Sequence, residues 1–225
     1  MKSCNSTWLG LLVVAAAAIP QVQAATEISL PGTGVSGGGA KLVPGATDPH
    51  WTVTTGPGIP LPTNAVVVAN QHPLGFYFAS PDSMWVWTNA AATAIVDSPY
   101  TFDLAFDLTG YDANSATLSG AWGVDNLGRI FLNGSPAVGA GTLALTTVST
   151  DTFNTPYSFT IGSGFLPTIN HLQFQVTDAG LVAALNVRGL SVQVSAVPEP
   201  AGASLMLIGL FGVLANLRRT RQFGK

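Results

Sequence analysis

Three carboxylates lie close together in the middle of this 225-residue chain, at Asp103, Asp107 and Asp112. Calcium binds several oxygen ligands from carboxylates and carbonyls, so these residues are candidate ligands for a structural calcium ion. Calcium is the only cofactor that the sequence suggests. No Asp-x-Asp-x-Asp loop is present, and three solvated aspartates are the alternative.

A second polar group shares one connection between predicted strands, at Asp125, Asn126 and Arg129. The guanidinium of Arg129 has two candidate partners. It can form an ion pair with Asp125, or it can hydrogen-bond to a hydroxyl or carboxylate of a sugar. We therefore treat all three residues as candidate ligand-binding residues.

Two tryptophans, Trp85 and Trp87, are separated by one residue and so share a face of any strand. An exposed pair would offer flat aromatic faces to the apolar face of a sugar ring. A buried pair would belong to the core. The pair is a candidate carbohydrate-binding platform, with core packing as the alternative.

The sequence predicts no enzyme. The three histidines, His50, His72 and His171, are scattered, and none is closely spaced to another or to a glutamate. The chain has no Gly-x-Ser-x-Gly elbow, no His-Glu-x-x-His motif and no phosphate-binding loop. Glycosidases need two placed carboxyl groups, whereas the acids here are nearly all aspartates in turns or alternating strands.

The charge balance argues against nucleic acid as a partner. All eleven acidic residues, but only Lys41, Arg129 and Arg188 among the bases, lie between the two apolar ends of the chain. Three bases against eleven acids give about −8 for this region, compared with −3 for the whole chain. A nucleic-acid-binding domain would need a basic face.

The N-terminus has the features of a secretory signal peptide at residues 1–24. Lys2 precedes an apolar stretch at 8–19, and Val22-Gln23-Ala24 is a small-x-small cleavage motif. We expect cleavage after Ala24, with Ala25 as the alternative. The only cysteine, Cys4, lies in the removed part, so the exported chain would contain no disulfide and no cysteine nucleophile.

The C-terminus, residues 197–225, combines a Pro-Glu-Pro step, an apolar run at 201–217 and a basic end. As a helix the apolar run would span roughly 25 Å, slightly less than the hydrocarbon core of a bilayer. The basic end predicts a single membrane-spanning helix with its C-terminus in the cytoplasm. An ordinary permanent anchor and a buried helix are the alternatives.

This tail resembles the PEP-CTERM sorting signal of Gram-negative bacteria. The resemblance implies a transient membrane anchor, processing by a membrane-embedded exosortase, and delivery to the cell surface or the extracellular matrix. It rests on Val197, Pro198, Glu199, Pro200, Arg218, Arg219 and Arg221.

Between the two ends, the pattern predicts an all-β fold. Residues 100–108 alternate between apolar and polar, as do 116–124 and 172–176, which is typical of half-buried strands. Residues 25–47 read as a Gly- and Thr-rich loop or loosely held strand, followed by a β-sandwich at 48–196. Shorter strands are expected at 51–54, 65–69, 75–78, 84–87, 129–132, 142–147, 157–161 and 185–194.

The body resembles a galactose-binding-like jelly roll, as found in carbohydrate-binding modules. The resemblance rests on Asp125-Asn126-x-Gly128-Arg129 running into Asn133-Gly134, and on Asn170-His171-Leu172-Gln173-Phe174. It implies a jelly-roll β-sandwich and a carbohydrate ligand without identifying the sugar.

The sequence therefore predicts a non-enzymatic, exported cell-envelope protein that binds carbohydrate or exopolysaccharide. A structural surface protein without a small ligand is the first alternative. The second is an ice-binding adhesin, for which the threonine array at Thr146, Thr147, Thr150 and Thr152 is short and irregular.

Overall fold

The computed structural model describes residues 24–137, 153–180, 182–197 and 209. The predicted signal peptide up to residue 23, the predicted strand at 142–147 and the threonines at 146–152 lie outside this part. So does the predicted membrane span, apart from Gly209. Among the described residues, no helix has the length and apolar character needed to cross a membrane.

The described part is an all-β structure with one short 3₁₀ helix, η1 (Pro73–Gly75). Its strands are β1 (Ala25–Ser29), β2 (Thr47–Thr55), β3 (Thr63–Val67), β4 (Val86–Trp87), β5 (Pro99–Asp107), β6 (Tyr111–Asp125), β7 (Leu127–Leu132), β8 (Ser135–Pro136), β9 (Tyr157–Ile161), β10 (Ile169–Thr177) and β11 (Ala184–Ala196).

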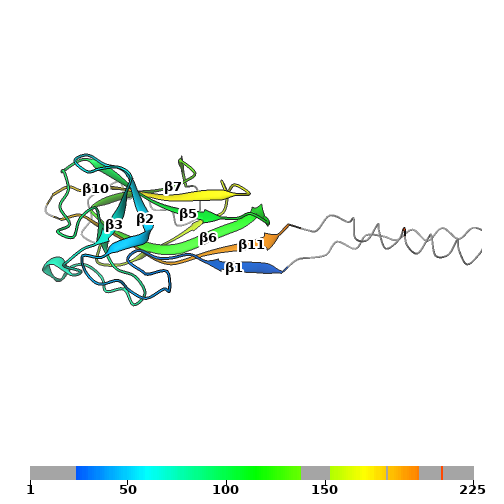
Figure 1. Cartoon of the computed structure of the whole chain (residues 1–225), viewed down its shortest axis with the longest axis horizontal. Helices are drawn as coiled ribbons and strands as arrows, with labels where there is room; N and C mark the ends of the chain where they lie inside the picture. The colour runs from blue at the N-terminus through cyan, green and yellow to red at the C-terminus, as the bar shows by residue number, and fades with distance from the viewer. Residues whose placement is uncertain (1–23, 138–152, 181, 198–208, 210–225) are drawn as a thin grey trace, which may run out of the picture.

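The strands form a β-sandwich in which every described strand pair is antiparallel. One layer has the order β8-β7-β10-β5-β2, and the other has β4-β11-β6-β9, with β1 also paired to β11. Strand β3 bonds to both β2 and β4 and so joins the layers. Figure 1 shows β5, β7 and β10 on one side of the molecule and β1, β6 and β11 on the other.

Aromatic side chains fill the space between the layers. Phe174 of β10 is fully buried. Its ring lies 5.3 Å from that of Trp122 in β6 and 5.8 Å from that of Phe159 in β9. These contacts cross from one layer to the other, which places the core between β10 and the β6–β9 pair.

The alternation predicted for the longer strands is confirmed. In β5 the buried apolar residues are Tyr100, Phe102, Leu104 and Phe106, followed by Leu108 just after the strand. In β10 the buried apolar residues are Leu172, Phe174 and Val176. Since the side-chain period of a strand is two, these positions all face the core.

One of the shorter strand predictions is wrong, and another is longer than the strand observed. The 75–78 segment forms no strand, because Pro73 and Gly75 begin and end a single 3₁₀ turn there. The 84–87 strand is reduced to the two residues of β4. The Gly- and Thr-rich segment at 25–47 contains β1 at its start and an isolated bridge between Val35 and Lys41.

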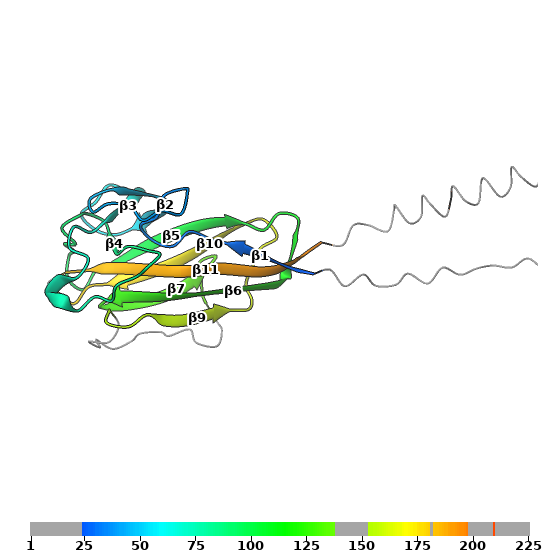
Figure 2. The same ribbon diagram turned by 90° about the horizontal axis from the view of Figure 1, so that it is seen from below.

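The first and last strands lie side by side. Ala25 of β1 pairs with Ser195 of β11, and the N–H of Val197 donates to the carbonyl of Gly110 at 3.0 Å. Figures 1 and 2 show β1 beginning and β11 ending at the same end of the sandwich, here called the base. The opposite end is called the tip.

Candidate functional site

The two candidate stacking tryptophans are both buried, with Trp85 1% and Trp87 0% exposed. The Trp85 ring packs against Tyr77 and Phe78, and its indole N–H donates to the Phe78 carbonyl at 3.1 Å. Trp87 packs against two aromatic rings of β5. An exposed aromatic platform at these positions is therefore wrong, and core packing is their role.

Asp125 is also an interior residue, 5% exposed. The hydroxyl of Tyr77 donates to its Oδ2 at 2.7 Å, and the side-chain amide of Asn126 donates to its Oδ1. The Asn126 Oδ1 in turn accepts from the N–H of Ala179 at 2.8 Å. Through these bonds the carboxylate at the end of β6 is connected to Tyr77 and, by way of Asn126, to the loop after β10. All of these segments lie at the tip.

Burial raises the pKa of Asp125 to about 6. The hydrogen bond from Tyr77 lowers this pKa, and the nearby carboxylate of Asp178 raises it. A carboxyl group with a raised pKa in the folded protein stabilises the fold most at low pH. That contribution is complete below the unfolded pKa of about 4 and is lost as the pH rises through 6.

We predict that Asp125→Asn becomes more stable relative to the native chain as the pH rises. The native carboxylate must ionise in a buried position, whereas the amide cannot ionise. A pKa difference of roughly two units corresponds to about 3 kcal/mol gained by the variant between about pH 4 and pH 7. Urea unfolding across this range measures it. A difference that stays constant with pH would contradict the assignment.

The exposed Asp107 is the matched control for that experiment. Its Oδ1 accepts from the hydroxyl and the N–H of Thr109, and these bonds lower its pKa. The stability of Asp107→Asn relative to the native chain should therefore change with pH in the opposite direction and only slightly.

Arg129 does not pair with Asp125. In β7 the inward positions are Gly128, Ile130 and Leu132, so Arg129 points to the exposed face while Asp125 points into the core. Within the described residues, the ion pair observed is between His171 and Asp103, and Arg129 takes no part in it. The Asp125–Arg129 ion pair, one of the two alternatives for Arg129, is wrong, because Asp125 is buried at the end of β6 in one layer and Arg129 lies on the outer face of β7 in the other.

A calcium site built from Asp103, Asp107 and Asp112 is also wrong. Asp103 Oδ2 accepts from His171 Nδ1 at 2.8 Å, between β5 and β10. Asp107 and Asp112 each cap a local turn through Thr109 and Asn114. In the part of the chain that the structure describes, no group of three or more His, Cys, Asp or Glu side chains is arranged to hold a metal ion.

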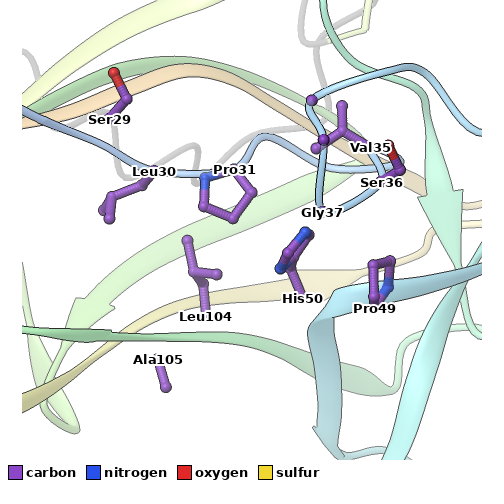
Figure 3. Close-up of a pocket in the computed structure, with 12 residues that line it drawn as sticks. Ser29, Leu30, Pro31, Val35, Ser36, Gly37, Pro49, His50, Leu104 and Ala105 are labelled. Carbon is purple, nitrogen blue, oxygen red and sulfur yellow. The ribbon is translucent and has the colours of Figure 1, made fainter.

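The structure instead places an open cleft between β2, β5 and the segment that follows β1 (Figure 3). Its volume is about 610 Å³, within the range typical of small-molecule sites. Leu104 and His50 point into it from the two strands, as Figure 3 shows. The lining residues are Ser29, Leu30, Pro31, Val35, Ser36, Gly37, Gly38, Gly39, Pro49, His50, Leu104 and Ala105.

The segment at 30–39, which we call the roof of the cleft, is held in place by Asp48. Asp48 is fully buried, and its Oδ2 accepts from the N–H of Gly34 at 2.6 Å. Its Oδ1 accepts from the N–H groups of His50 and Trp51. Burial raises the pKa of Asp48, while these three N–H donors lower it. One carboxylate thus joins the roof segment to β2.

The cleft combines an aliphatic wall with one buried polar atom that has no hydrogen-bond partner among the described residues. Leu30, Pro31 and Leu104 supply the wall. The Nε2 of His50 is buried without a hydrogen-bond partner among the described residues. Such a group is costly unless a water or ligand satisfies it.

Sequence reasoning missed this site. Its placement of the glycines at 37–39 in a loop and of Leu104 in the core is confirmed, but nothing in the pattern showed that these residues lie beside His50. The glycine-rich run was the available signal, because it lets the roof turn tightly over the cleft. Gly39, with φ +79°, adopts a conformation that favours glycine.

Comparisons with known proteins give little further identification. No protein-family model matches the chain. No curated protein matches it either.

Two solved structures are similar. One is CBM35 from Paenibacillus barcinonensis, at 16% identity and TM-score 0.35, covering 66% of this chain and 94% of that chain. The other is the GH31 alpha-xylosidase from Xanthomonas citri, at 12% identity and TM-score 0.29, covering 66% of this chain and only 16% of that one. At these TM-scores, neither similarity supports an inference about fold or function.

Proposed function

We propose that this chain is a non-enzymatic, exported cell-envelope protein that binds carbohydrate, with exopolysaccharide as the expected ligand. The body would be a galactose-binding-like jelly roll, and an exosortase would process the tail. The tail proposal rests on the Pro-Glu-Pro step, the apolar run and the arginines. The absence of a recognisable catalytic motif in the sequence favours binding over catalysis.

The cleft is the observation that carries the binding proposal. Carbohydrate sites need an apolar surface beside a few placed hydrogen-bonding groups. The aliphatic wall supplies the first, and His50 and the glycine-rich rim supply the second. This differs from the aromatic platform expected from the sequence, since Leu30, Pro31 and Leu104 take the place of the tryptophans.

We predict that blocking the cleft weakens glycan binding strongly. A Cβ added at Gly38 meets only the Ser36 hydroxyl oxygen, at 3.9 Å, so Gly38→Trp should fold normally and fill the opening. Residues 25–197 would be applied to a glycan array, with calcium and with a chelator. For the glycans that bind, the variant should lose at least about tenfold in affinity, or ~1.4 kcal/mol.

The matched control is Gly162→Trp, because a Cβ there meets nothing within 4 Å and the residue lies outside the cleft. It should bind like the native chain. Equal binding by both variants would rule out the cleft as the site. A complete absence of glycan binding by the native body would instead favour the alternative of a structural surface protein without a small ligand.

A further inference from the structure

Three apolar side chains are exposed at the base of the sandwich. Leu166 is 46%, Ile169 is 48% and Val197 is 52% exposed. We call these three residues the basal strip. Leu166 and Ile169 lie in and just after the loop that precedes β10, and Val197 directly follows β11.

Backbone hydrogen bonds connect the parts of this strip. The N–H of Leu108 donates to the Thr168 carbonyl at 3.0 Å, and the N–H of Tyr111 donates to the Leu108 carbonyl at 3.0 Å. The N–H of Val197 completes the series by donating to Gly110. The segments that carry the strip therefore meet at one end of the molecule, where β1 begins and β11 ends (Figure 2).

The strip is also close along the chain to the predicted membrane span. Val197 is still bonded to the sandwich, and the apolar run begins at Ala201. Four residue steps reach at most ~14 Å even when fully extended. The headgroup region on one side of a bilayer is roughly 5–8 Å thick. A span that starts at Ala201 therefore holds the base within a short distance of the lipid surface, whatever the conformation of the residues between.

We propose that the basal strip docks on the surface of the lipid bilayer while the tail is inserted, so that the base lies on the membrane and the tip points away from it. This rests on the membrane-held tail of the proposed function. The strip contains no basic residue, and the nearest charged side chains at this end include Asp107 and Asp112. Apolar contact with zwitterionic lipid, without attraction to anionic lipid, fits this composition.

The absence of cysteine from the body allows a direct test. In residues 25–225, the expected exported chain, which contains no native cysteine, a single cysteine at Leu166→Cys carries a fluorophore, and the protein is reconstituted in phosphatidylcholine vesicles. The matched control is Val96→Cys, which is 50% exposed three residues before β5, at the tip. Nitroxide-labelled lipid should quench the label at 166 several-fold more than the label at 96.

A second variant tests the strip itself. Adding Ile169→Asp and Val197→Asp to the Leu166→Cys chain should reduce the lipid quenching at least twofold. If those changes prevent folding, the comparison between positions 166 and 96 decides alone. Equal quenching at both positions, with the label at 166 accessible to a water-soluble quencher, would overturn the proposal.

Two further readouts separate this proposal from others. Carbonate extraction reports whether the tail is inserted. Release of the chain by carbonate would refute the membrane-held state, whereas retention with a water-exposed position 166 would refute only the docking. Energy transfer between differently labelled copies at position 166, without lipid quenching, would identify the strip as a contact between copies and overturn the lipid assignment.

Discussion

Phe174→Ala should lower the free energy of unfolding by about 3–5 kcal/mol, the range for removing a buried aromatic side chain. The Phe174 ring is fully buried and lies against the rings of Trp51, Trp122 and Phe159 at 5.7, 5.3 and 5.8 Å. These partners come from both layers. The substitution therefore opens a cavity at the junction of the two sheets, where collapse of one strand cannot fill it.

Urea unfolding of residues 25–197 measures this loss, and Gln175→Ala is the control one residue along β10. Gln175 lies half-buried on the outer face, between Arg129 of β7 and Thr101 of β5. Truncating it should change the stability by about 0.5 kcal/mol or less. Similar losses for the two variants would mean that the faces of β10 are assigned incorrectly.

Changing Pro198, Glu199 and Pro200 to alanine should leave export intact and block removal of the tail. Proline fixes φ and lacks a backbone donor, so both prolines disfavour a helix, and the proposed sorting signal would present an extended segment to its protease. An immunoblot of the inner-membrane fraction should then show the full-length tail persisting. Release as efficient as that of the native chain would favour a simple anchor or an unspecific protease.

The arginines at the end of the tail provide a second comparison. Replacing Arg218, Arg219 and Arg221 with glutamine removes the charge that would stop transfer in the proposed membrane-held tail, so the segment should slip toward the periplasm. Replacement with lysine keeps the charge and should preserve both retention and processing. If the glutamine and lysine variants behave alike, the positive charge is not what positions the tail.

The long strands could be predicted from the sequence because one face of each is buried. In β5 the period-two pattern alone identifies Phe102, Leu104 and Phe106 as core residues. The short strand β4 had no such pattern, since Trp85, Val86 and Trp87 are all buried. When both faces of a segment are covered, periodicity carries no information about exposure, and the tryptophan pair could not be assigned from sequence.

Asp103 shows a second limit of sequence patterns. It alternates with core residues and so was expected on the solvated face, yet it is only 7% exposed. His171 of β10 covers it from the neighbouring strand, which is distant in sequence. The cleft was hidden for the same reason, because His50, Leu104 and the glycine-rich roof meet only when β2, β5 and the segment after β1 are assembled.

The pairing of β1 with β11 determines when the protein can finish folding. Synthesis delivers a chain N-terminus first, so β1 appears first and its partner residues, Ser191–Ser195, appear last. Contacts between such distant residues form slowly, because a long loop must close before they stabilise anything. Until β11 arrives, the aromatic strands that will form the core stay accessible to other chains. Without a cysteine in the body, no disulfide can hold an early intermediate together, so the fold depends on packing that is complete only once β11 has formed.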